Sequence, residues 1–249
     1  MQDKIYGLNP VIEALESGAQ IDKILLKDGA RNNKVKNITA MAKEKKIPFQ
    51  FVDSRRLDTL TDGGNHQGVV AFAAVYKYFS VEDILNKAKE KGEPPFIVIC
   101  DSLTDPHNLG SIIRTANAAG VHGVIIPKNR SAGLNSTVYK VSAGACEYTK
   151  VAKVTNLSRT VEELKKNGLW VTGTVLEAQK YHYESDLKGP LAVIIGSEGE
   201  GISKGLREKC DFLVKIPMLG EIESLNASVA AGVLLYEAVR QRSGEQKRG

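Results

Sequence analysis

The alternation of hydrophobic and polar positions predicts a small α/β unit at the start of the chain. Residues 7–18 carry apolar side chains at helical spacing and end in Gly18, which predicts a short helix. Apolar runs after it predict strands, and a second segment of helical spacing stops before Pro48. These further elements are strands at 21–27, 48–53 and 69–75 and a helix at 33–47. We expect a compact domain over residues 1–75.

A polar stretch separates this part from the rest of the chain. Residues 80–95 are mostly charged or polar and end in Pro94 and Pro95, a composition typical of a connection between domains. We therefore expect a linker over residues 76–95.

From residue 96 onward, apolar strands alternate with helical patterns. Strands are predicted at 95–103, 123–127, 151–155, 169–175, 191–196 and 212–218, and helices at 111–120, 157–168 and 226–242. This alternation predicts an α/β domain over residues 96–249, with a mostly parallel sheet covered by helices on both faces. Ligands of such sheets bind at the carboxyl ends of the strands, where the glycine-rich and polar segments of this chain fall.

Composition supports a folded, two-domain protein and leaves its partners open. Apolar residues make up 42% of the 249 residues and charged residues 25%, which excludes a disordered chain. No apolar run approaches about 18 residues and no secretory leader opens the chain, so we expect a cytoplasmic protein without a membrane span. The formal net charge of +5 is compatible with RNA but also with many enzymes that bind none.

The metal-binding residue types are scattered. The three cysteines are far apart without CxxC spacing, and no two of the histidines and cysteines stand four residues apart. We expect neither a disulfide framework nor a metal site.

Basic residues concentrate in one early segment. The segment from Lys27 to Lys46 contains seven lysines and arginines but only two acidic residues, Asp28 and Glu44. A nucleic-acid-binding patch and an ordinary solvated helix face explain this equally well.

The first segment with candidate chemistry is residues 101–120, which follow a strand. Asp105 and Pro106 predict a turn, Asn108 is a candidate helix cap, and Arg114 lies close enough to the helix start to face the strand ends. A capped crossover helix with a solvated arginine is the alternative.

The second segment is a glycine-rich loop, residues 193–202, directly after an apolar strand. Glycines there allow backbone N–H groups to approach a ligand, but the order matches neither a dinucleotide site nor a P-loop. Glu198 and Glu200 repel phosphate and favour a cationic ligand such as a sulfonium or ammonium. A loop without a ligand is the alternative.

The third segment is residues 215–240. A strand ends at Pro217, a loop passes through Gly220 and Ser224, and Asn226 precedes a helix that begins with small residues. That helix face is predicted to pack closely, either in the core or against a second subunit.

Together the three segments resemble motifs 1, 2 and 3 of the SpoU branch of the SPOUT RNA 2′-O-ribose methyltransferases, over about residues 96–242. The third motif, IPM-x-G-x-x-x-SLN-x-S-x-A, is the most specific. The first domain resembles the L30e-like RNA-binding domain that precedes many of these enzymes. The resemblance implies a deep trefoil knot, S-adenosylmethionine bound in it, and a homodimer, formed through the C-terminal domain, that shares the active site.

The resemblance also implies roles for particular residues. Residues expected to bind the cofactor are Gly196, Ile216, Leu225, Thr174, Ser197, Gly201 and Met218, and those expected to line the catalytic site are Arg114, Asn108, Glu198, Ser224 and Asn226. Arg114 is a key residue in the family. Because a guanidinium is nearly always protonated, we expect it to clamp a phosphate and stabilise charge rather than act as a base; Glu198 is the competing base candidate.

The RNA substrate is less well defined by the sequence. The two-domain plan most resembles enzymes that methylate a guanosine of 23S rRNA, with tRNA guanosine methylation as the second possibility. Two other classes remain: a non-catalytic ribosome-associated RNA-binding protein, and an α/β enzyme for a small molecule. The presence of Arg114, Glu198 and Asn226 together argues against the first, and the N-terminal module argues against the second.

Overall fold

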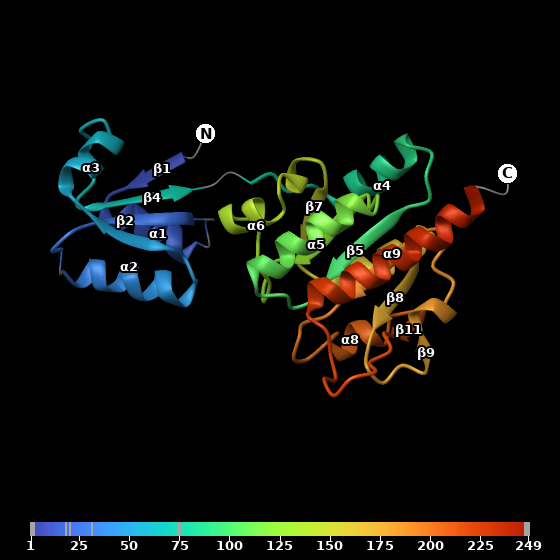
Figure 1. Ribbon diagram of the computed structural model, residues 1–249. Helices are drawn as coiled ribbons and strands as arrows, with labels where there is room; N and C mark the ends of the chain where they lie inside the picture. The colour runs from blue at the N-terminus through green and yellow to red at the C-terminus, as the bar shows by residue number, and fades with distance from the viewer. Residues whose placement is uncertain (1–2, 18, 20, 31, 74–75, 247–249) are drawn as a thin grey trace. The chain divides into compact units, whose positions relative to one another are not determined.

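The computed structural model describes residues 3–17, 19, 21–30, 32–73 and 76–246. Gly18, Arg31 and the end of the strand expected at 69–75 therefore lie outside the described residues. The chain divides into two compact units, residues 1–76 and 77–249, and each is described by itself (Figure 1).

The first unit is a four-stranded mixed sheet with helices on both faces. The sheet order is β1-β4-β2-β3, and only β2 and β3 run parallel. The strands are β1 (Asp3–Tyr6), β2 (Ile21–Lys27), β3 (Phe49–Val52) and β4 (Val69–Ala73), and the helices are α1 (Leu8–Glu16), α2 (Asn33–Glu44) and α3 (Ser54–Leu60).

Alternating side chains of β2 build two cores in this unit. Ile24 and Leu26 pack with α1 and α2, whereas Leu25 packs with Leu57 of α3 on the opposite face. The predicted strands and the first two helices are present; the short elements β1 and α3 had no expected counterpart.

The segment expected to be a linker contains a helix that belongs to the second unit. Helix α4 (Val81–Glu90) begins at a capping box in which Ser80 and Asp83 bond each other's backbone N–H. Ile84 is fully buried in the core of the second unit, and a Cβ at Gly123 would lie 2.5 Å from it. The polar composition of residues 80–90 reflects the outer face of this amphipathic helix.

The second unit confirms the predicted α/β fold. Seven strands pair in parallel in the order β7-β6-β5-β10-β8-β11-β9. They are β5 (Phe96–Cys100), β6 (Gly123–Pro127), β7 (Lys150–Val154), β8 (Trp170–Thr174), β9 (Lys180–Tyr181), β10 (Leu191–Ile195) and β11 (Phe212–Lys215). The chain proceeds outward from β5 to β7 and then returns to the other side, so β5 and β10 flank the switch point at which such sheets bind ligands.

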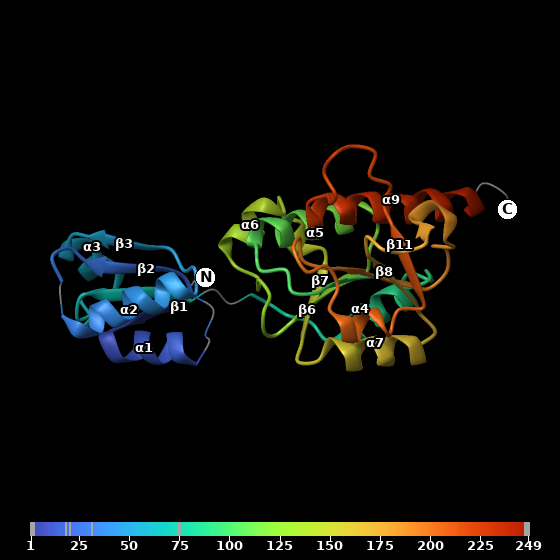
Figure 2. The ribbon, with the colours of Figure 1, turned by 90° about the horizontal axis from the view of Figure 1, so that it is seen from below.

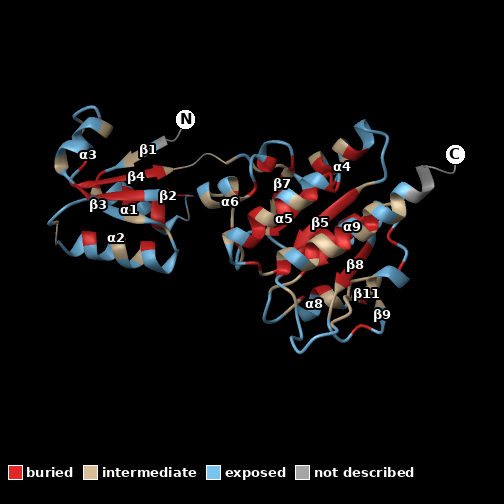
Figure 3. Cartoon of the chain, in the orientation of Figure 1, coloured by how far each residue is buried: buried red, intermediate tan, exposed pale blue. Residues whose placement is uncertain are grey.

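Helices cover both faces of this sheet (Figure 2). On one face lie α5 (Pro106–Ala118), α6 (Ser136–Val141) and α9 (Ala227–Gln246), with α5 in contact with both others. On the other lie α4, α7 (Leu157–Lys166) and α8 (Lys204–Arg207), whose apolar side chains share a core with the strands. The central strands between these layers are buried (Figure 3).

Helix α5 begins earlier than the sequence predicted. Asp105 caps it by accepting a hydrogen bond from the N–H of His107, and Pro106 occupies the first turn. Asn108 is therefore not the cap: it lies inside the helix and its side chain is free for another role.

Within the described ranges, no helix is both long and apolar enough to cross a membrane.

Candidate active site

A cavity of about 210 Å³ opens at the carboxyl ends of β8, β10 and β11. All seven residues expected to bind a cofactor line it: Thr174, Gly196, Ser197, Gly201, Ile216, Met218 and Leu225. Two of the residues expected at the catalytic site, Glu198 and Ser224, also line it. The three loops after these strands thus form one site.

The loop after β10 is folded tightly on itself. Ser197 and Gly201 exchange two backbone hydrogen bonds of 3.0 Å, and Gly201 has a positive φ of 65°. A Cβ on Gly196 would lie 2.1 Å from the carbonyl carbon of Gly201, so only glycine fits there. The close approach of the two backbone segments shapes one wall of the cavity.

A buried acid anchors the far end of this loop. The carboxylate of Asp101, directly after β5, accepts a 2.7 Å hydrogen bond from the N–H of Ser203. Asp101 is 5% exposed, and its own N–H donates to the carbonyl of Ile195. Sequence reasoning missed this residue; an acid immediately after a fully apolar strand, at the switch point, was the available signal.

Three predicted catalytic side chains from different segments meet in one hydrogen-bond network. The Asn108 amide donates to Oε1 of Glu198 over 2.9 Å. The Asn226 amide donates to the same oxygen and also, over 2.9 Å, to Oδ1 of Asn108. The network connects α5, the β10 loop and the start of α9, and it holds the Glu198 carboxylate in one orientation.

Asn226 also caps helix α9. Its Oδ1 accepts hydrogen bonds from the N–H and the hydroxyl of Ser228, at 3.0 and 2.6 Å. One side chain therefore fixes the helix start with its oxygen and Glu198 with its nitrogen, which explains why an amide rather than a carboxylate suits this position.

Arg114 is not brought together with the other predicted catalytic residues. It is exposed on α5 and does not line the cavity. It lies six residues after Asn108, which is about 240° around a helix of 3.6 residues per turn, so it presents to another side. Among the described residues it forms no ion pair.

The cavity contains more charge than the sequence motifs indicated. Glu177, after β8, lies 3.5 Å from the guanidinium of Arg207 in α8, and Lys215 ends β11. With Glu198 and Glu200 the lining has three carboxylates and two cations. Glu177 and Arg207 lie outside the three motif segments, and Lys215 is the first residue of the third segment but belongs to no motif position that the sequence singled out.

The cysteines lack the reactivity of nucleophiles. Burial raises the pKa of the Cys100 thiol to about 12 and that of Cys210 to about 11, and it also raises the pKa of Cys146. Across the described residues, no group of three or more metal-ligating side chains is present.

The sequence between residues 95 and 236 matches the family model described as the SpoU rRNA Methylase family. The chain belongs to this family. It is thus an RNA methyltransferase of the TrmH/SpoU type. Residues 4–79 match a second family model, for the substrate-binding domain of RNA 2′-O ribose methyltransferases.

Relatives of this SpoU-family chain match it over nearly its whole length. A protein of Bacillus subtilis (strain 168), named as a TrmH family tRNA/rRNA methyltransferase, is 48% identical over 97% of this chain and 96% of its own. A protein of the same name from Staphylococcus aureus (strain Mu50 / ATCC 700699) is 47% identical over 96% of each chain.

Two solved structures of SpoU-type enzymes share the fold and contain AdoMet. AviRb from Streptomyces viridochromogenes is 25% identical with a TM-score of 0.62, over 98% of this chain and 91% of its own. The rRNA methyltransferase from Sinorhizobium meliloti is 27% identical with a TM-score of 0.58, over 96% and 87%. These matches confirm the predicted SPOUT-type fold class.

Proposed function

We propose that this protein transfers a methyl group from S-adenosylmethionine to the 2′-hydroxyl of a guanosine in 23S rRNA. The observation that carries the proposal is the network of Asn108, Glu198 and Asn226 at the edge of the cavity. In this network two amide groups, those of Asn108 and Asn226, donate to the Glu198 carboxylate. The carboxylate lines the cavity at the ends of β8, β10 and β11.

The cavity fits S-adenosylmethionine in its chemistry. Ile195, Ile216 and Leu225 provide apolar surface for a nucleobase, and glycine backbone is accessible at the β10 loop. Glu177, Glu198 and Glu200 suit a ligand with a sulfonium and an ammonium. When bound, the cofactor supplies an activated methyl group for in-line displacement.

The residues of this chain orient the ribose and stabilise charge. Glu198 and Asn226, held by their mutual hydrogen bonds, position the ribose hydroxyl for attack, which is the main contribution that geometry can make. The guanidinium of Arg114 binds the neighbouring phosphate and stabilises negative charge that develops on the oxygen. The hydroxyl proton goes to phosphate or water, with Glu198 as the second candidate.

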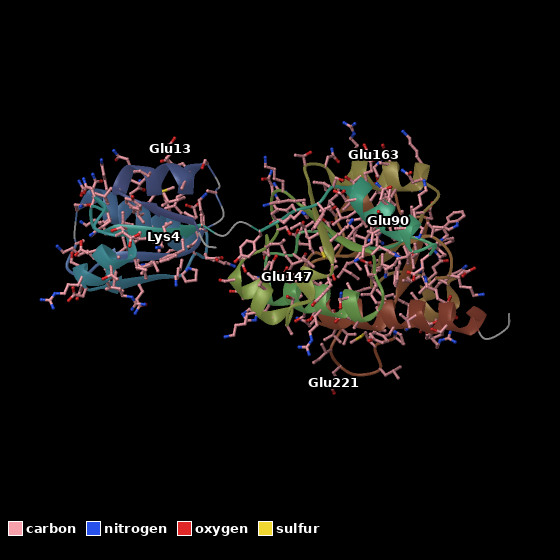
Figure 4. The ribbon with its side chains drawn as sticks, turned by 90° about the horizontal axis from the view of Figure 1, so that it is seen from above. Lys4, Glu13, Glu90, Glu147, Glu163 and Glu221 are labelled. Atoms are coloured by element: carbon pink, nitrogen blue, oxygen red, sulfur yellow. The ribbon has the colours of Figure 1, made fainter. Side chains whose placement is uncertain are left out.

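A homodimer is part of this proposal. Arg114 does not line the cavity of its own chain, so a site shared between two protomers gives it a place to act. Large apolar side chains are exposed together on α9 and the loop before it: Val229 is 50%, Tyr236 52%, Ile222 73% and Leu219 97% exposed. In Figure 4, Glu221 lies at the outer end of that loop, between Leu219 and Ile222 in sequence.

Exposed apolar surface of this kind marks subunit interfaces. Sedimentation at micromolar concentration should give a dimer, and Tyr236→Glu should give a monomer. A monomeric wild-type protein would contradict this part of the proposal.

The trefoil knot that the family resemblance implies stays a prediction.

The preference for rRNA rests on the two-unit plan. The related rRNA methyltransferase of Sinorhizobium meliloti covers 96% of this chain, whereas a TrmH/SpoU tRNA modifying enzyme from A. aeolicus covers only 66%. Methylation of a tRNA guanosine is the second candidate, since the curated relatives are named for both RNAs.

Mapping of 2′-O-methyl sites in 23S rRNA and tRNA, from cells with and without the gene, tests the substrate. We expect one guanosine of 23S rRNA to lose its methyl group in the deletion strain. Loss at a tRNA position alone would move the assignment to the second candidate.

A further inference from the structure

Two lysines lie at the carboxyl ends of the neighbouring strands β6 and β7, of which β7 is an edge strand. Lys128 directly follows β6, and Lys153 is the second-last residue of β7, paired with Ile126 of β6. The ammonium of Lys153 lies 5.2 Å from the centre of the Tyr78 ring. The Tyr78 hydroxyl accepts a 2.8 Å hydrogen bond from the N–H of Leu134, so the ring that supports Lys153 is itself held in place.

The charge of this lysine pair is not neutralised by any ion pair among the residues that the structure describes. Neither Lys128 nor Lys153 forms an ion pair with any carboxylate of the described part of the chain. Partial burial, and then repulsion by Lys128, lowers the pKa of Lys153. Like charges placed side by side and partly desolvated are unfavourable unless an anion binds between them.

A neighbouring pair of lysines differs in this respect. Lys77 and Lys150 both lie over the ring of Phe79, at 4.8 and 5.6 Å. Lys150 donates to the carbonyl of Asp83, and the hydrogen bonds from Ser80, with a smaller contribution from both lysines, lower the pKa of the Asp83 carboxyl. Their charge is thus partly compensated inside the fold, whereas no carboxylate of the described residues pairs with Lys128 or Lys153.

The pair lies on the same edge of the sheet as the proposed active site. All seven strands are parallel, so the end of β7 and the loop after β10 emerge on one side. Three strand spacings separate β7 from β10, about 14 Å at about 4.8 Å each. That separation suits contact with RNA a few nucleotides from the methylated ribose.

We propose that Lys128 and Lys153 bind a backbone phosphate of the RNA substrate, a few nucleotides from the one that is methylated. This inference rests on the proposed function, because it assumes that the ribose is placed at the β10 loop. Lysine is a suitable point charge for phosphate, and an ammonium fixed over an aromatic ring loses little freedom on binding. The contact adds affinity and register but no base specificity.

The test compares three full-length variants with the wild type, with an unmodified 23S rRNA transcript as the probe. The double variant Lys128→Gln with Lys153→Gln removes both charges, and Lys128→Arg with Lys153→Arg retains them. Lys166→Gln is the matched control: Lys166 is an exposed lysine in the last turn of α7, which leads to the amino ends of the strands.

RNA affinity is measured over a range of salt concentrations, with S-adenosylmethionine affinity as a check of folding. We expect the Gln double variant to lower the log-log salt slope by roughly 0.7 for each lost contact and to raise the KM for RNA, with kcat at saturating RNA retained. The Arg variant and Lys166→Gln should keep the wild-type slope.

An unchanged slope in the Gln double variant, or a loss that the Arg variant does not restore, would overturn the proposal. The proposed function fails separately, by the absence of methyl transfer from the wild-type protein. The salt slopes remain measurable in that case and still decide whether the lysine pair binds RNA.

Discussion

At the residue scale, the position of Arg114 predicts that it is needed for methyl transfer but not for cofactor binding. Because it is exposed on α5 and absent from the cavity lining, its removal should leave cofactor binding intact. We expect Arg114→Ala to lower kcat by at least about 100-fold, the usual effect of removing one group that stabilises the transition state. Calorimetric titration with S-adenosylmethionine and single-turnover methyl transfer measure the two effects. If cofactor affinity were lost with activity, Arg114 would be a cofactor ligand.

Two glycines of one loop make a matched pair for a second test. A Cβ at Gly196 collides with the backbone of Gly201 at 2.1 Å, whereas at Gly199 it meets nothing within 4 Å. We expect Gly196→Ala to displace the loop, to raise the Kd for S-adenosylmethionine at least about tenfold, and to cost about 1–3 kcal/mol in stability. Gly199→Ala should bind like the wild type. Equal affinities in both variants would show that the loop does not shape the cofactor site.

Single residues also show what the sequence could and could not predict about the site. The seven residues that the family resemblance assigned to the cofactor all line the cavity. They lie close together because each motif follows a parallel strand, and the ends of parallel strands share one edge of the sheet. The motif pattern could not place Arg114, since the side of a helix that a residue faces depends on where that helix starts, and α5 starts at Pro106. Asp101 and Arg207 were missed because their partners, Ser203 and Glu177, are distant in sequence.

At the scale of elements, His122 holds the start of β5, and its protonation should make the stability of the second unit depend on pH. The imidazole is 1% exposed; its Nδ1 accepts from the N–H of Phe96 and its Nε2 lies 3.0 Å from Glu93. Burial lowers the pKa of His122 below its ordinary value of 6.5, although the Glu93 carboxylate opposes the shift. The neutral ring is thus the form that the fold favours.

A histidine with a lowered pKa in the folded state contributes stability above its unfolded pKa and loses it as the pH falls below about 6.5. We expect the free energy of unfolding of the second unit to decrease on acidification, and to decrease less in His122→Gln. The single tryptophan, Trp170, lies in the second unit and reports its urea unfolding by fluorescence. An identical pH dependence in the variant would exclude this role.

Elements with strong periodicity were predicted, whereas helix α4 and several short elements were not. The buried strands β5, β6 and β10 appear as uninterrupted apolar runs, so the sequence alone identifies them as strands of a parallel sheet. Helix α4 contributes only Ile84 and Ala88 as buried residues, and its charged outer face resembles a linker. The β1 strand and helices α3 and α6 are short, and they are defined by tertiary pairing rather than by local pattern.

For the whole molecule, we expect the first unit to contribute to RNA binding and the second unit to bind the cofactor and catalyse methyl transfer. The exposed lysines of residues 27–46 and the family match of residues 4–79 both favour RNA binding by the first unit. We expect a chain lacking residues 1–76 to fold, dimerise and bind S-adenosylmethionine, but to methylate RNA poorly, because each unit has its own core.

The same truncation should flatten the salt dependence of RNA binding, since fewer phosphates are contacted. Filter binding over a range of salt concentrations checks this. Equal affinity and an equal slope for the full-length and truncated proteins would leave substrate choice to the catalytic unit and reduce the first unit to a role in stability or assembly.

The chemical identity of the methylated product decides whether this protein methylates the ribose of a guanosine. Purified wild-type protein is incubated with unmodified 23S rRNA transcript and isotopically labelled S-adenosylmethionine, and the RNA is digested to nucleosides and separated by mass spectrometry. We expect label in 2′-O-methylguanosine with the wild-type protein and its loss with Arg114→Ala. Label confined to a methylated base, or no label in 23S rRNA or tRNA transcripts, would contradict it.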